Sequence, residues 1–247
     1  MTFHFFPDFS KRILEAELMD SSECDEMRLF KSFEQMVFIN RFFSRSRFLL
    51  KRYLIPDMLR DPSREYHLLD LGAGGCDLPV WFLSHTQKIG LRVRVTCLDF
   101  DPRALRFAKQ KYGHIPRLHF QEGAASLLET QNFQADYIFA NHFLHHLPPD
   151  AIPSLIRSIH HQSKRGFLLN DLCRSLFSYF AYTVFAGLFF HRSFTFHDGR
   201  LSIRRGFLKN EVKEWIEILG LKNQIHCSSY FPGRLILHGF KNVGGDK

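Results

Sequence analysis

The chain has 247 residues, a formal net charge of +8 and 45% hydrophobic residues. This length can bury one full core, and the hydrophobic content excludes an intrinsically disordered chain. The five cysteines form no C-x-x-C pair and no even framework, which predicts reduced thiols in a cytoplasmic protein. Acids lie close to the apolar residues near the N-terminus, a pattern that does not resemble a signal peptide.

The first predicted strand leads into a glycine turn. The apolar run His67–Leu71 contains Asp70 and is followed by glycines within 72–75 and by a segment typical of a helix, 78–83. Such a unit lets a ligand lie against bare backbone, because glycine lacks a Cβ and adopts positive φ. A dinucleotide fingerprint would place its third glycine at Asp77, and that carboxylate would repel phosphates. The turn therefore disfavours NAD and FAD.

The same pattern resembles motif I of the class I S-adenosylmethionine (SAM) methyltransferases, which is an acid followed by G-x-G. A further glycine is common in that family, and Cys76 stands in its place here. SAM has no phosphate, and a nearby carboxylate attracts its sulfonium and amino groups. The resemblance implies SAM as the cofactor. It assigns the binding of SAM to Asp70, Gly72, Ala73 and Gly74.

The second predicted strand, 93–100, also ends in an acid. Asp99 closes this run, Phe100 follows it, and a helical stretch extends to Tyr112. An acid that closes the second strand of a βαβ unit can accept hydrogen bonds from ribose hydroxyls. The alternative is that Asp99 only caps the helix that starts after Pro102. We assign Asp99 and Phe100 to the cofactor site.

The third predicted strand, 118–120, leads to Gly123 and Ala124. The resemblance places the adenine near these two residues. Members of the family often have an acid at the second position, where this chain has Ala124. Either Glu122 substitutes for that acid or backbone groups alone contact the adenine.

The fourth predicted strand, 135–140, leads into Asn141 and a paired histidine motif at His145 and His146. In the resembled family this strand end faces the methyl group that is transferred, so Asn141 is assigned to the cofactor site. The Asn-x-x-Leu-His-His-Leu-Pro form resembles methyltransferases of small molecules. It lacks the Asp/Asn-Pro-Pro-aromatic signature of enzymes that methylate nucleobase amines. The resemblance spans about residues 66–172.

Transfer to a hydroxyl requires alignment of donor and acceptor and removal of a proton. Histidine titrates near pH 6.5 and is a suitable base. We favour His145 as the base, with His146, His142 and His197 as alternatives, and expect Asp171 either to orient that histidine or to bind an acceptor hydroxyl. No metal site is predicted, because the side chains of adjacent histidines are expected to diverge.

Strands that alternate with helices predict an α/β fold of one domain. We expect a Rossmann-like, doubly wound, mostly parallel seven-stranded sheet whose last two strands, 224–231 and 234–240, form an antiparallel hairpin. The predicted parts are an N-terminal helical cap (1–63), a SAM-binding core (64–171), an aromatic lid insert (172–206), and a C-terminal helix with the hairpin (207–247).

The insert contains an apolar segment, Leu176–Phe190, that is shorter than the roughly 20 residues of a membrane span. Three interpretations stay open: a core helix, a wall for a lipophilic substrate, and an interfacial helix flanked by Arg174 and Arg192. Between Gln35 and Pro56 there are five bases and no acid. That run faces solvent, anionic lipid or nucleic acid. No RNA-binding module is visible, which disfavours nucleic acid.

Two further segments, 170–175 and 197–207, resemble a subgroup of bacterial methyltransferases distantly similar to the ubiquinone and menaquinone biosynthesis enzymes. This resemblance implies a lipophilic, hydroxylated acceptor. The sequence therefore predicts a SAM-dependent methyltransferase that acts on a lipophilic small molecule at a hydroxyl. The alternatives are a non-catalytic SAM-binding or membrane-peripheral protein and an RNA methyltransferase.

Overall fold

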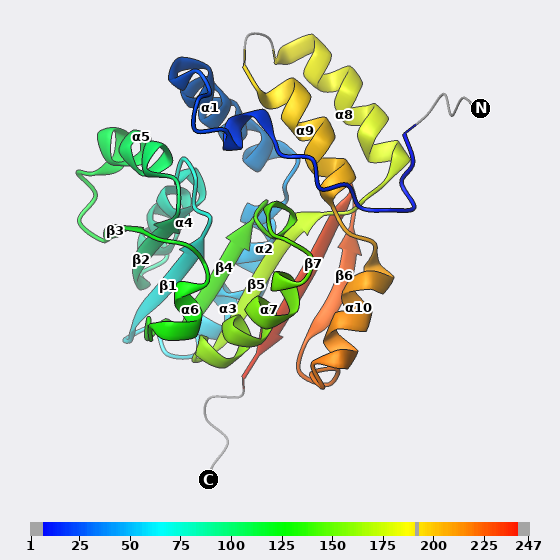
Figure 1. Ribbon diagram of the computed structural model, residues 1–247. Coiled ribbons are helices and arrows are strands. Elements are labelled where there is room, and N and C mark those ends of the chain that lie inside the picture. Colours follow the sequence, from blue (N-terminus) through cyan, green and yellow to red (C-terminus); the bar gives the residue numbers. More distant parts are fainter. Residues whose placement is uncertain (1–6, 191–192, 242–247) are drawn as a thin grey trace, which may run out of the picture.

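The computed structural model describes residues 7–190 and 193–241. They are built around a seven-stranded sheet of order β3-β2-β1-β4-β5-β7-β6 (Figure 1). The strands are β1 (Glu65–Leu71), β2 (Arg92–Asp99), β3 (Leu118–Glu122), β4 (Tyr137–Asn141), β5 (Gly166–Leu172), β6 (His226–Tyr230) and β7 (Arg234–Phe240). The first five run parallel, and β7 is antiparallel to both β5 and β6. The predicted sheet and its C-terminal antiparallel pair are confirmed.

Helices cover both faces of the sheet. They are α1 (Glu26–Phe42), α2 (Ser46–Tyr53), α3 (Ile55–Met58), α4 (Asp77–Lys88), α5 (Pro102–Tyr112), α6 (Leu127–Thr130), α7 (Ala151–Gln162), α8 (Leu176–Phe189), α9 (Thr195–Arg205) and α10 (Lys209–Ile218), with short 3-10 turns η1 (Leu18–Asp20) and η2 (Leu144–His146). Alternate strand residues enter two cores, because successive side chains of a strand point to opposite faces. Leu68 packs in the core with α2, α3 and α4, and Leu69 packs in the core with α6, α7 and α10.

Local sequence signals set several helix starts. Asp25 and Asp101 accept backbone N–H bonds at the first turns of α1 and α5, and Pro102 occupies the first position of α5. The side chain of Ser175 accepts the backbone N–H of Ser178 at the first turn of α8. The helix predicted at 78–83 is part of the longer α4.

The insert folds into α8 and α9, which pack on each other and lie with α1 above the carboxyl ends of the strands (Figure 1). β1 pairs with β2 on one side and with β4 on the other, so the chain order reverses there. In open α/β sheets a ligand crevice forms at this switch point, beyond the carboxyl ends of the strands.

The ends of α8 differ from the sequence-based expectation. Arg174 is buried and donates to the carbonyl oxygens of Phe9 and Gly206, and it pairs with Glu211 at 2.5 Å. The prediction that Arg174 flanks the helix at a lipid surface is therefore wrong, and Arg192 lies outside the described residues. Within 7–190 and 193–241, no helix has the length and apolar character needed to cross a membrane.

Candidate active site

A cavity of about 720 Å³ lies between the carboxyl edge of the sheet and the overlying helices. Ten of the predicted site residues line it: Asp70, Gly72, Ala73, Gly74, Asp99, Phe100, Ala124, Asn141, His145 and His146. Asp171 lies behind them, hydrogen-bonded to His145. Gly123 does not line the cavity. Its backbone N–H donates to the carbonyl oxygen of Asp99, so Gly123 supports the end of β2.

The glycine turn forms one wall. Gly72 has φ +64° and donates to the carbonyl oxygen of Leu98, and a Cβ there would lie 2.3 Å from the ring of Phe143. Gly74 has φ +51° and faces open space. Cys76 also adopts φ +57°, which explains why glycine suits this position and why the chain bears some strain here.

Three carboxylates surround the turn. Asp99 accepts the N–H of Gly74 at 2.7 Å and that of Asp101 at 2.9 Å. Asp70 is buried at the end of β1, and no donor among the described residues pairs with its carboxylate. Burial, with the charges of Asp77 and Asp99, raises the pKa of Asp70 well above its ordinary value. Burial also raises the pKa of Asp99, and raises that of Asp77 to about 6.

A chain of amide side chains links this wall to β4. The Asn40 amide donates to one oxygen of Asp77 at 2.9 Å, and the other oxygen has no partner among the described residues. Asn141 donates to Asn40 at 3.0 Å and accepts from Ser46 at 2.6 Å. This network fixes Asn141 at the floor of the cavity, where the sequence predicted it.

The part of the cavity where the sequence predicts adenine binding is sparsely polar. The ring of Phe100 is 60% exposed, and Ala124 and Ala125 stand with it in the lining. Glu122 does not line the cavity.

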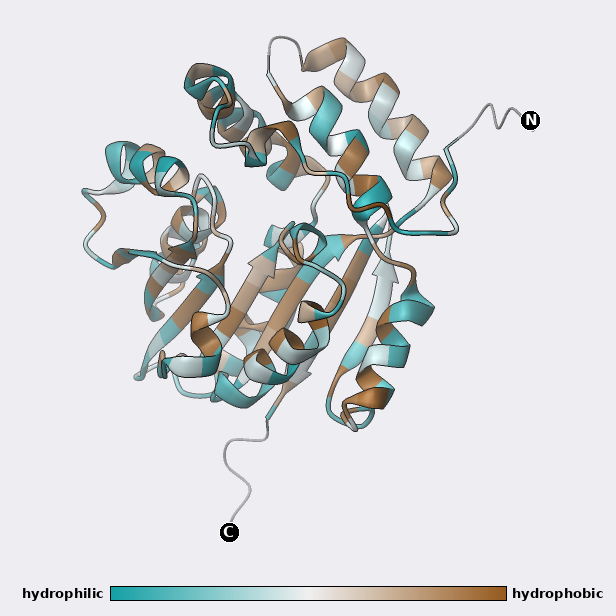
Figure 2. Ribbon diagram, in the orientation of Figure 1, coloured by the Kyte–Doolittle hydropathy of each residue, from teal (hydrophilic) through white to brown (hydrophobic). Residues whose placement is uncertain are grey.

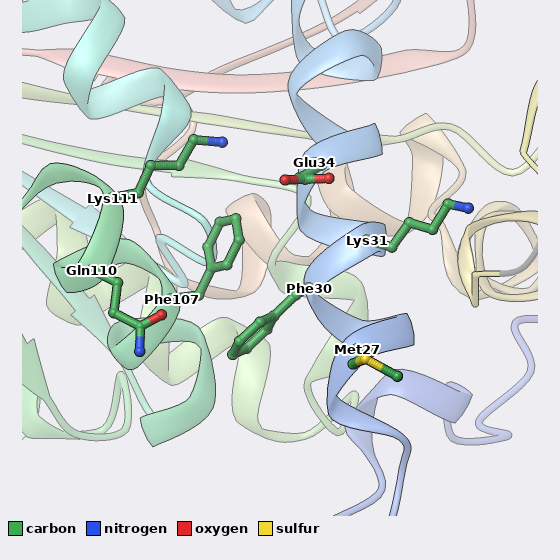
Figure 3. Close-up of a pocket in the computed structure, with 7 residues that line it drawn as sticks. All are labelled: Met27, Phe30, Lys31, Glu34, Phe107, Gln110 and Lys111. Atoms are coloured by element: carbon green, nitrogen blue, oxygen red, sulfur yellow. The ribbon is translucent and has the colours of Figure 1, made fainter.

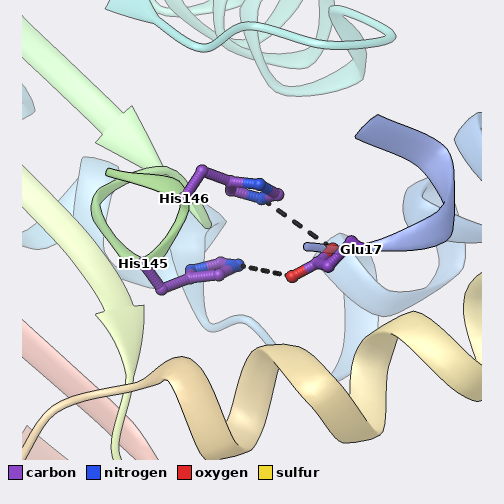
Figure 4. A group of neighbouring side chains, drawn as sticks. All are labelled: Glu17, His145 and His146. Atoms are coloured by element: carbon purple, nitrogen blue, oxygen red, sulfur yellow. Dashed lines mark ion pairs between the residues drawn. The ribbon is translucent and has the colours of Figure 1, made fainter. Parts of the chain in front are cut away.

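The predicted pair of His145 and Asp171 forms in the structure. Nδ1 of His145 lies 2.6 Å from the Asp171 carboxylate, and Nε2 lies 3.6 Å from Glu17 (Figure 4). Burial would lower the pKa of His145, but the charges and hydrogen bonds of Asp171 and Glu17 raise it to about 9. In the same way, His145 holds the pKa of the buried Asp171 well below its ordinary value.

Glu17 was missed as a site residue by sequence reasoning. It is 3% exposed and comes from the N-terminal segment that crosses the cavity. Burial would raise its pKa, but His146 and His145 lower it to about 2. Asp198 accepts the N–H groups of Leu18 and Met19 and so fixes this segment on α9. An isolated acid in a loop gives no sequence signal for such a role.

The histidine pair does not diverge as expected. The rings of His145 and His146 are 4.4 Å apart, and ligand atoms of both lie within 4.8 Å of one another and of Glu17 (Figure 4). Histidine nitrogens and a carboxylate are the donors that zinc takes. The Glu17 carboxylate is already paired with the Arg205 guanidinium, 3.9 Å away, and with both histidines. These partners balance its negative charge without a metal ion.

His197 lies away from the role considered for it, and Arg205 supports the site through contacts with the backbone. Arg205 is buried and donates to the carbonyl oxygens of His145 and His146, so it holds η2 in place. His197 is half-exposed and pairs with Asp198 outside the cavity lining. His142 does line the cavity, with φ +54°, and burial lowers its pKa well below the ordinary value.

The wall opposite the glycine turn is apolar and aromatic. It comes from α1, α8 and the β6–β7 connection, and its aromatic side chains are Phe43, Phe177, Tyr182, Phe185 and Phe231. Phe33 of α1 also lines the cavity but lies against Gly75 of the glycine turn. A separate hollow lies between α1 and α5 (Figure 3). Its lining includes Phe30, Phe107, Lys31, Glu34 and Lys111. The two hollows share no lining residue.

Residues 68–166 match the family model described as a methyltransferase domain. No curated protein matches the sequence. Among solved structures, the chain is similar to the plantazolicin methyltransferase BpumL in complex with a pentazolic desmethylPZN analog and SAH, with TM-score 0.62, 12% identity and coverage of 88% of this chain and 97% of that chain.

Two further structures are similar over most of this chain. One is the CMeT domain of the citrinin polyketide synthase, with TM-score 0.61, 12% identity and coverage of 90% of this chain and 61% of that chain. The other is human N-acetylserotonin methyltransferase in complex with SAM, with TM-score 0.58, 16% identity and coverage of 89% and 57%. This chain spans less than two thirds of either. These similarities show the Rossmann-like fold that the similar methyltransferase structures share, and the match to the methyltransferase-domain model covers residues 68–166.

Proposed function

We propose that this protein is a SAM-dependent methyltransferase that transfers a methyl group to a hydroxyl of a lipophilic small molecule, such as a quinol, a phenol, or a polyketide- or isoprenoid-like compound. One observation carries the choice of cofactor. Asp70, Asp77 and Asp99 surround a glycine turn, and burial together with repulsion from Asp77 and Asp99 raises the pKa of Asp70. A bound cation relieves this repulsion, and a phosphate would increase it. The methyltransferase match and the similar structures solved with SAM or SAH support the same cofactor.

The cavity residues fit this cofactor. The backbone of Gly72, Ala73 and Gly74 would lie along it, and the partnerless carboxylate of Asp70 would face its cationic groups. Asp99 keeps free acceptor capacity for ribose hydroxyls, because each of its oxygens uses one lone pair on a backbone N–H. Phe100 offers an exposed ring to the adenine. When bound, SAM supplies an electrophilic methyl group.

The opposite wall would receive the acceptor. Its aromatic lining favours a lipophilic ring or chain, and His145 stands between that lining and the glycine turn. Asp171 lies 2.6 Å from Nδ1 and favours a proton there, so Nε2, which faces Glu17 in the structure, is the atom that would accept the hydroxyl proton. The ring of His146 lies beside that of His145, and its Nδ1 lies 3.2 Å from the Asp20 carboxylate.

The test separates binding from turnover. His145→Ala, His146→Ala and Asp171→Asn are assayed for SAM affinity and for SAH release with a panel of quinols, phenols and hydroxylated polyketides. General-base catalysis contributes about 10²–10⁴-fold, so at least one variant keeps SAM affinity and loses turnover by about 100-fold. His160→Ala, which changes a half-buried histidine outside the cavity lining, serves as the matched control.

The base assignment is wrong if all three variants turn over like the wild type. The acceptor class is wrong if the wild type methylates no member of the panel while it binds SAM. Strong, salt-dependent binding of RNA by that protein would instead favour the RNA methyltransferase alternative.

A further inference from the structure

Helix α8 presents an apolar face to the outside of the molecule. Of its 14 residues only Tyr179 and Ala186 are buried, and the helix contains no charged residue. Phe177, Val184 and Phe189 are 63%, 66% and 63% exposed. Figure 2 shows α8 as an outermost helix, coloured apolar or neutral along its length. A folded chain rarely leaves such a face in water unless it binds something.

Ring contacts extend this face across neighbouring elements. Phe189 contacts Phe185 at 5.0 Å, Phe185 stacks with Phe38 at 5.9 Å, and Phe38 contacts the exposed Phe42 of α1 at 4.6 Å. At the other end of α8, Phe177 lies 6.1 Å from Phe231, which is 71% exposed. We call the exposed set Phe42, Phe48, Phe177, Val184, Phe189 and Phe231 the aromatic face.

Arginines stand at the edge of the aromatic face. The guanidinium of Arg41 lies 5.3 Å from the ring of Phe42, and that of Arg45 lies 5.2 Å from Phe48. Arg45 also donates to the carbonyl oxygen of Phe231 at 3.2 Å. The sequence from Gln35 to Pro56 contains no acid to neutralise these charges. Apolar side chains ringed by cations match the chemistry of an anionic bilayer surface.

The aromatic face also surrounds an opening of the cavity. Phe177 and Phe231 belong both to the cavity lining and to the exposed surface, as does Phe43 between them and α1. A lining residue that is exposed stands at a mouth of the cavity. The acceptor wall therefore opens where α8, α1 and the β6–β7 connection meet.

We propose that the aromatic face and its arginines dock this protein on an anionic membrane surface, with the mouth of the acceptor wall toward the lipid. A lipophilic acceptor dissolved in the bilayer then enters the cavity without crossing water. The delivery of the acceptor rests on the proposed function. Docking itself rests only on the exposed rings and the cations beside them.

Vesicle sedimentation tests docking without SAM or turnover. The full chain is incubated with vesicles of phosphatidylcholine, with and without phosphatidylglycerol. Wild type sediments with the anionic vesicles. Val184→Asp/Phe189→Asp lowers the partition coefficient at least tenfold, and Arg41→Glu/Arg45→Glu lowers it by about fivefold or more for each arginine.

Matched controls lie away from the aromatic face. Ile218→Asp changes an apolar side chain of α10 that is 78% exposed, and Lys88→Glu/Arg92→Glu reverses two exposed charges at the end of α4 and the start of β2. Both variants keep wild-type sedimentation. Wild type that ignores anionic vesicles overturns the proposal. So does self-association that Val184→Asp/Phe189→Asp abolishes, since the face would then bind a second copy. Neither outcome bears on SAM binding, so the proposed function stands or falls separately.

Discussion

Two walls of the cavity differ in how their charged groups are paired. The cofactor wall contains Asp70, Asp77 and Asp99 around the glycine turn, and the catalytic wall contains His145, Asp171 and Glu17. On the cofactor wall, Asp70 is buried without a donor, and Asp77 leaves one oxygen unpaired. On the catalytic wall, His145 lies between the carboxylates of Asp171 and Glu17. An unpaired buried carboxylate is costly and indicates a site for a cation, whereas a neutralised cluster stores and moves a proton. The contrast supports the proposal that one wall binds the cofactor and the other transfers a proton.

The walls also differ in how the chain builds them. The cofactor wall comes mainly from consecutive residues 70–78 and 99–101, at the ends of neighbouring parallel strands. The catalytic wall joins the N-terminal segment, η2, the end of β5 and α9, which are far apart in the sequence. A local change should therefore damage the cofactor wall alone, while the catalytic wall should respond to changes in distant segments.

The largest expected effect is on the local wall. Gly72→Ala forces a side chain into a left-handed residue and against the ring of Phe143 at 2.3 Å. The two costs together lower the free energy of unfolding by about 3 kcal/mol, measured by urea denaturation. Gly74→Ala has a positive φ but meets no atom within 4 Å, so it costs about 1 kcal/mol. Equal losses in the two variants would contradict the close packing at Gly72.

A smaller effect probes the distant wall. The ring of His145 must be neutral to accept a proton, and two carboxylates raise its pKa to about 9. The value of kcat/KM should therefore rise about tenfold per pH unit below pH 9, reach half of its maximum near pH 9 and level off about one unit higher. Glu17→Gln removes one carboxylate and moves this rise to lower pH, and the exposed Glu15→Gln leaves it in place. A profile that Glu17→Gln leaves unchanged would mean that another group accepts the proton.

The sequence predicts the cofactor wall because its signals are local. An acid that ends a strand, followed by glycines and a helix, indicates where Asp70 and the turn lie, and Asp99 follows from the same rule one strand later. The position of Gly123 in its motif predicted a place in the cofactor site. In the structure its backbone supports the end of β2, and the residue does not line the cavity. The parallel sheet follows from the alternation of strands and helices.

The catalytic wall was predicted only in part. The pair of His145 and Asp171 follows two neighbouring strands, so their proximity is accessible from the sequence. Glu17 and Asn40 reach the cavity only through tertiary packing of the helical cap, and no sequence pattern predicts their place in the site. The expectation of diverging histidines failed because η2 is a short 3-10 turn whose carbonyls Arg205 holds.

Calorimetric titration with SAM and SAH tests the central claim most directly. Wild type should bind both at one site with micromolar affinity, and Asp99→Ala should weaken binding tenfold or more, which is about 1.4 kcal/mol. Asp25→Ala, which removes a helix cap on α1 away from the cavity lining, should bind SAM like the wild type. A wild-type protein that is folded and binds neither compound would contradict the account, because the carboxylates around the glycine turn would then serve some other ligand.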